Sequence, residues 1–93
     1  MSDLLLVYED FLKTEKRAST NTVSSYLRDV GQFAAAMDGR DMALTQVAVQ
    51  DVEEYANSLI KRGKSPATVT RSVASIKSFY SCLMERGYVE QNP

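Results

Sequence analysis

The feature that most constrains the fold is a run of apolar residues at helical spacing between residues 20 and 37. Steps of three and four residues put these side chains on one face of a helix, and that face has to be buried. Ser19 is a good N-cap, and Gly39 is expected to end the helix in the left-handed conformation. The expected inward residues are Val23, Tyr26, Leu27, Val30, Phe33, Ala34 and Met37.

Three more segments show the same period: residues 2–16, residues 49–62, and the stretch that begins at Ser65-Pro66 and ends at Arg86-Gly87. A serine followed by proline typically begins a helix, and a cation followed by glycine typically ends one. No segment alternates as a strand would. We therefore expect an all-α, compact four-helix bundle in one domain, residues 1–93. Its further inward residues are Leu5, Tyr8, Phe11, Leu12, Val52, Tyr55, Ala56, Leu59, Ile60, Val69, Val73, Ile76, Tyr80 and Leu83, with Phe79 at the edge.

Several function classes are disfavoured by composition. The chain has no histidine, which removes His-based metal sites and His acid–base chemistry. Its four glycines are far apart, so no glycine-rich phosphate loop is present. We expect no cofactor, no metal, no small-molecule substrate and no catalysis. A single cysteine, Cys82, fits a reducing cytoplasm, and the chain shows neither a signal peptide nor a membrane-length apolar run.

Charge is unevenly distributed along the chain. The formal net charge is −1, which by itself argues against nucleic acid. Residues 55–84, however, carry five basic side chains and no acidic one. A basic segment on an otherwise acidic chain gives a polarised surface that can steer a polyanion to one side.

The fourth helical segment carries an unusual number of hydroxyl side chains. Projected at about 100° per residue, Thr68, Arg71, Ser72 and Ser75 share one flank, and Lys77 falls on the other with Thr70 and Ala74. Small hydroxyls permit close approach to a duplex, and arginine can contact phosphate or guanine. The alternative is a solvated helix face, although such faces usually favour better helix formers.

The start of the second helical segment repeats this composition, with Thr22 and Ser25 preceding Arg28. The free N–H groups and positive dipole end of a helix N-terminus suit phosphate. Plain N-capping by Ser19 is the alternative explanation, and it holds in either case.

Two motifs in these same helices resemble a known family. The run Ser19 to Val30 is similar to the S-x-x-T-x-x-x-Y-x-x-D-[LV] pattern of tyrosine recombinases of the Xer and phage-integrase kind. Ser65 to Arg71, followed by Ile76 to Tyr80, is similar to their S-x-x-T-x-x-R…L-[RK]-x-F-Y helix, and Gly87 with Asn92-Pro93 matches their G…NP ending. The resemblance covers essentially the whole chain. One departure is Ala48, where the family pattern has Ser or Thr as the cap of the third helix.

The resemblance implies a SAM-like core-binding domain that clamps one face of a double-stranded DNA half-site. Its second and fourth helices would lie at the major groove, and its first helix would contact neighbouring recombinase protomers. A separate C-terminal domain, absent from this chain, would carry the catalytic residues of a cytoplasmic, bacterial or phage-type recombinase. The candidate DNA contacts are Thr22, Ser25, Arg28, Thr68, Arg71, Ser72, Ser75 and Lys77.

Two functions from different classes remain open. The leading hypothesis is a non-catalytic DNA-binding domain of a site-specific recombinase or integrase, and the alternative is a helical protein–protein interaction module. An adaptor should expose an apolar patch, which periodicity does not reveal. On the DNA hypothesis, replacing Arg71 should weaken DNA binding and leave the fold intact, because the projection turns Arg71 away from the apolar stripe.

Overall fold

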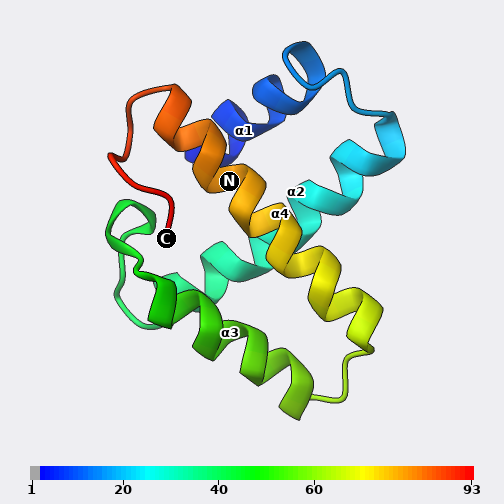
Figure 1. Cartoon of the computed structure of the whole chain (residues 1–93), viewed down its shortest axis with the longest axis vertical. Helices are drawn as coiled ribbons and strands as arrows, with labels where there is room; N and C mark the ends of the chain where they lie inside the picture. The colour runs from blue at the N-terminus through cyan, green and yellow to red at the C-terminus, as the bar shows by residue number, and fades with distance from the viewer. Residues whose placement is uncertain (1–2) are drawn as a thin grey trace.

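The computed structural model describes residues 3–93. It contains α1 (Asp3–Thr14), α2 (Thr20–Asp38), a short 3-10 turn η1 (Leu44–Gln46), α3 (Val49–Lys61) and α4 (Pro66–Glu85), with no strand among the described residues. The expected all-α four-helix bundle is confirmed. Figure 1 shows α4 crossing α2, with α1 and α3 toward opposite ends of the molecule. Helix α4 packs against all three other helices, which makes it the centre of the bundle.

Helices α2 and α4 begin with the same capping arrangement. The Ser19 hydroxyl accepts the Thr22 backbone N–H at 3.2 Å and donates to the Thr22 hydroxyl at 3.0 Å. Ser65 and Thr68 repeat both bonds at the same distances. Each cap satisfies one N–H that the first turn of a helix leaves without a partner. Both helices begin at the same side of the view in Figure 1, at its right.

The helix ends only partly follow expectation. Gly63 and Gly87 adopt the left-handed conformation, with φ of 80° and 83°, after α3 and α4. The prediction for Gly39 is wrong, since its φ is −63° in the right-handed region. After α2, the left-handed conformation occurs instead at Asp41, whose φ is 54°.

Helix α3 compensates only in part for its missing cap residue. Ala48 has no side-chain acceptor, but the Asp51 carboxylate accepts the Ala48 backbone N–H at 2.9 Å. Arg40 in turn bridges Asp51 and Glu54 at 3.2 and 3.0 Å. Asp51 therefore supplies the reciprocal half of a capping box, and its negative charge favours the positive end of the helix, but the N–H that Ser or Thr would have accepted gains no side-chain acceptor.

Aromatic side chains dominate the core. Tyr8 of α1 meets Phe79 of α4 edge to face at 5.4 Å, and Phe33 of α2 meets Tyr55 of α3 at 5.2 Å. The Tyr80 hydroxyl donates to the Leu44 carbonyl at 2.7 Å, which ties η1 to α4. All four inward residues predicted for α1 are buried, as are Val23, Val30, Phe33, Met37, Val52, Tyr55, Leu59, Ile76, Tyr80 and Leu83. Tyr26, Leu27, Ala34 and Ala56 are only half-buried.

Cys82 also belongs to this core. Its side chain is fully enclosed in α4, and burial raises the pKa of the thiol to about 11. The thiol therefore stays protonated at neutral pH.

The buried face of α4 is rotated from its predicted position. Val69 and Val73 are only half-buried, whereas Ser72 is 4% exposed and Ser75 and Phe79 are 0% exposed. Helix α1 reaches this flank, where the Tyr8 hydroxyl donates to the Ser75 carbonyl at 3.3 Å, and α2 reaches it through the Asp29–Arg71 pair. Small side chains leave room for such neighbours. The Ser75 hydroxyl finds its partner within the helix, donating to the Ser72 carbonyl at 2.8 Å.

Ile60 is a second exception, being 59% exposed rather than inward. Helix α3 packs mainly against α4 alone, so its buried stripe is narrow and Ile60 falls outside it.

Candidate nucleic-acid interface

The centre of the candidate interface is an ion pair where α2 crosses α4. Arg71 Nε and Nη2 donate to the two carboxylate oxygens of Asp29 at 2.8 and 3.2 Å. The Asp29 side chain is 4% exposed and that of Arg71 is 41% exposed. The hydrogen bond from Arg71 and the charge of Asp29 raise the pKa of the guanidinium. A two-pronged pair of this kind fixes orientation as well as distance.

This pair corrects the role expected of Arg71. The sequence suggested a cation projecting freely from the fourth helix. In the structure, the edge of the Arg71 guanidinium that carries Nε and Nη2 is already bound to Asp29. The edge that stays exposed can still reach an anion. Arg71 therefore joins α4 to α2 through Asp29.

Two of the predicted contact residues do not lie on the surface. Ser72 and Ser75 are buried between α4 and its neighbours, so the expectation that they line an exposed flank is wrong. The helical projection took the apolar stripe as the centre of the buried face, whereas the buried face of α4 extends to the two serines. Neither side chain can touch a duplex unless the helices separate.

The other predicted residues divide into three groups. Thr22 and Thr68 are half-buried and engaged by the capping serines. Ser25, which is half-buried, and Arg28, which is exposed, lie in α2 and precede Asp29 in the sequence. Lys77 is exposed elsewhere, in shallow recesses that it shares with Thr70 and Val73 of α4 and with the start of α3.

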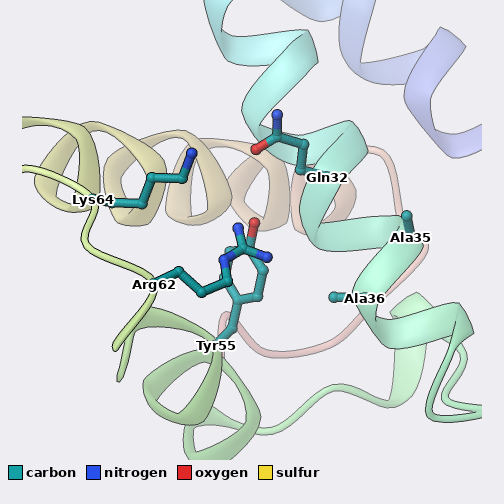
Figure 2. Close-up of a pocket in the computed structure, with 6 residues that line it drawn as sticks. All are labelled: Gln32, Ala35, Ala36, Tyr55, Arg62 and Lys64. Carbon is teal, nitrogen blue, oxygen red and sulfur yellow. The ribbon is translucent and has the colours of Figure 1, made fainter. Parts of the chain in front are cut away.

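A basic recess that was not predicted lies where α2 meets the α3–α4 junction. Figure 2 shows Gln32 reaching into it from α2 and Arg62 and Lys64 from the junction, around Tyr55. Sequence reasoning placed the two cations in the acid-free segment but took Tyr55 as purely structural. The one sequence feature that hinted at this region is the spacing of Arg28 and Gln32, which are four residues apart and therefore share one face of the helix.

The described residues hold no group of three or more His, Cys, Asp or Glu side chains that could bind a metal ion. Among the helices of residues 3–93, none is long and apolar enough to span a membrane.

Comparison with known proteins gives a consistent picture. The profile described as "Phage integrase, N-terminal SAM-like domain" matches residues 6–87. The chain is 38% identical over 84 residues to a protein named as a tyrosine recombinase in Caldanaerobacter subterraneus subsp. tengcongensis, covering 90% of this chain and 29% of that protein. It is 35% identical over 96 residues to the tyrosine recombinase XerD of Listeria innocua, covering 100% of this chain and 32% of that protein.

The tyrosine recombinase XerC of Anoxybacillus flavithermus is 31% identical over 90 residues, covering 96% of this chain and 30% of that protein. The chain thus spans about a third of the length of these relatives. No solved structure matches at a significant level.

Proposed function

Because the chain belongs to the family of phage integrase N-terminal SAM-like domains, we propose that it binds double-stranded DNA as the non-catalytic, N-terminal part of a site-specific recombinase. In this role it clamps one face of a recombination half-site while a separate C-terminal domain performs strand breakage and rejoining. Its partners are then DNA and other recombinase protomers, and its place is the cytoplasm, where the DNA is.

The observation that carries the proposal is the locked crossing of α2 and α4. The Asp29–Arg71 pair holds together the two helices that the family resemblance puts at DNA. Both helices begin with a Ser–Thr cap, so each has a hydroxyl-rich, electropositive first turn. Arg28, next to Asp29, is exposed and forms no ion pair with any residue in the described range.

The proposed contacts follow from exposure. Arg28 and the exposed edge of Arg71 contact phosphates or base edges, while the half-buried hydroxyls of Thr22, Ser25 and Thr68 hydrogen-bond phosphates at close approach. Lys77, on another part of α4, contributes charge at longer range. Ser72 and Ser75 act only by letting the helices pack.

Helix α1 is the proposed contact between protomers. It carries Leu6, whose side chain is 51% exposed. The other large exposed apolar side chains lie on different elements: Val49 and Ile60 in α3, Met84 in α4 and Tyr88 in the tail.

Fluorescence anisotropy with a labelled duplex tests the proposal. We expect affinity to fall about tenfold or more between roughly 50 and 200 mM salt, because binding displaces counterions from the phosphates. Arg28→Ala should weaken binding about five- to a hundredfold with an unchanged melting temperature.

Lys13→Ala is the matched control, because Lys13 is an exposed cation of α1 already paired with Glu9 at 3.2 Å. Binding that ignores salt, or that survives Arg28→Ala and is lost with Lys13→Ala, would refute the proposed face.

A further inference from the structure

The recess between α2 and the α3–α4 junction has features that non-specific electrostatic attraction between the domain and DNA would not require. It is lined by Gln32, Ala35 and Ala36 of α2, by Tyr55 of α3, and by Arg62 and Lys64 of the junction. The two alanines leave room that longer side chains would fill. Figure 2 shows the Arg62 guanidinium over Tyr55, with the side chains of Gln32 and Lys64 extending toward each other from opposite sides and the amide oxygen of Gln32 on the side of Lys64.

Tyr55 is the unusual member of this group. Its side chain is 6% exposed, and its ring packs edge to face against Phe33 at 5.2 Å. Its hydroxyl nevertheless makes no hydrogen bond with any of residues 3–93. Tyr8 and Tyr80, the other buried tyrosines, both donate to backbone carbonyls. The Tyr55 hydroxyl lies at the wall of the recess and is open to solvent, so it is free to donate to a ligand atom.

The hydroxyl is also in the correct protonation state to donate. Burial raises the pKa of Tyr55, and the positive charge of Arg62 only partly opposes this shift. Tyr55 therefore keeps its proton at neutral pH and offers it to an acceptor.

The two cations of the recess lack counterions. The side chains of Arg62 and Lys64 form neither an ion pair nor a hydrogen bond with the described residues, whereas Arg40, Arg71 and Arg86 are each paired with carboxylates. The segment from 55 to 84, which contains both cations, has no acidic residue. Two cations, an amide N–H₂ and a hydroxyl donor converging on one space are complementary to an oxyanion.

We propose that this recess holds one backbone phosphate of the bound duplex, with Tyr55, Arg62, Lys64 and Gln32 as its donors. This inference rests on the proposed function and specifies a contact within it. Gln32 lies one helical turn beyond Arg28 on the same face of α2, so a strand contacting Arg28 runs on toward the recess. The phosphate sets the position of the duplex on the domain and carries no sequence information.

The test compares two neighbouring lysines by anisotropy on the same duplex. Lys64→Gln and Lys61→Gln remove the same charge three residues apart, but only Lys64 lines the recess. We expect Lys64→Gln to weaken binding about three- to tenfold and to lower the slope of log affinity against log salt by about 1, with a smaller change for Lys61→Gln. Equal losses in the two variants would overturn the inference, because general attraction depends only on charge.

A second pair of variants isolates the hydroxyl. Tyr55→Phe keeps the ring packing and should weaken DNA binding about threefold or more, whereas Tyr88→Phe, in the exposed tail, should not. Melting temperatures of both variants should match the unchanged protein. Tyr55→Phe binding as tightly as the unchanged chain would overturn the role of the hydroxyl.

Inorganic phosphate separates this inference from the proposed function. In an NMR titration with phosphate, we expect the Gln32 side-chain amide to shift in the unchanged chain and not in Lys64→Gln. If the duplex binds but no recess variant matters, the phosphate site fails and the proposed function stands. If phosphate shifts Gln32 while the duplex does not bind, both the DNA occupant and the proposed function fail.

Discussion

Arg71 and Arg86 both reach from α4 or its end to another helix, yet their surroundings differ. Arg71 places two nitrogens on the two oxygens of one carboxylate, at 2.8 and 3.2 Å, and that carboxylate is 4% exposed. Arg86 uses a single nitrogen for Asp10 and Glu15, both at 3.3 Å, and these side chains are 58% and 42% exposed. The Arg86 Nε is buried and has no hydrogen-bond partner among the described residues.

The difference shows that the count of ion pairs says little about how firmly two helices are held. A forked pair on a buried carboxylate is directional and poorly screened, whereas long contacts to exposed carboxylates are weak and sensitive to salt. The α2–α4 crossing is therefore expected to be rigid, and the contact between α1 and the end of α4 adjustable. Under the proposed function, the DNA-facing helices stay fixed while α1 adapts to a neighbouring protomer.

Breaking the crossing should have the largest effect. Arg71→Ala leaves Asp29 buried without its cation, and we expect the melting temperature to fall by roughly 10 °C. Asp29→Ala should cost less, because Arg71 is partly exposed and can turn to water. Thermal unfolding followed by circular dichroism measures both. This reverses the expectation that Arg71 could be replaced without affecting the fold, and it makes Arg28 the better position at which to test DNA binding.

If Arg71→Ala melts within a degree or two of the unchanged protein, the crossing is held by packing alone. The double variant Asp29→Ala with Arg71→Ala is the control, and it should recover part of the loss because no charge remains buried.

A smaller effect is expected at the other arginine. Asp10→Ala removes one exposed, long contact of Arg86, and Glu15 remains as a partner. We expect the melting temperature to fall by roughly 0 to 4 °C, and the difference to disappear in about 1 M salt. The same thermal scans at low and high salt check it. A loss as large as that of Arg71→Ala would show that the two regions are equally constrained.

The smallest effect concerns pH at the same end of the molecule. A hydrogen bond with Glu15, followed by desolvation and the charge of Glu15, raises the pKa of Glu85 above its ordinary value of 4.5. The folded chain therefore retains a proton that the unfolded chain has lost. That contribution to stability is present below pH 4.5 and is lost as pH rises through the raised pKa of Glu85.

Glu85→Gln keeps a donor toward Glu15 and does not titrate. Its melting temperature should therefore rise relative to the unchanged chain as pH increases from the ordinary pKa of Glu85 to neutrality. Melting curves recorded across that range test the sign. A difference independent of pH would mean that Glu85 and Glu15 do not share a proton.

The helices were predictable because their causes are local. The apolar stripe of α1, the Ser19 and Ser65 caps and the terminal glycines at 63 and 87 depend on neighbours a few residues away. The family motifs could be recognised in the sequence for the same reason, because the spacing of their residues follows the helix period. Asp29 was visible only as a motif position, and its partner Arg71 lies 42 residues away.

The surface was less predictable because it depends on which flank of a helix its neighbours cover. Ser72 and Ser75 have polar side chains and look solvent-facing until two helices pack on them. Ile60 looks buried until α3 is found to have one main neighbour. The recess requires Gln32, Tyr55 and the α3–α4 junction to meet in space, and no single segment encodes that meeting.

The enclosed thiol of Cys82 makes it possible to measure how often the helix bundle opens. A protonated thiol at the centre of the bundle reacts with a labelling reagent only after α4 separates from its neighbours, so the labelling rate at excess reagent reports how often that opening occurs. Because it is the sole cysteine, every labelled molecule records the same event. A duplex bound across α2 and α4 would slow the reaction in proportion to its occupancy, so binding could be timed without attaching a probe to either partner.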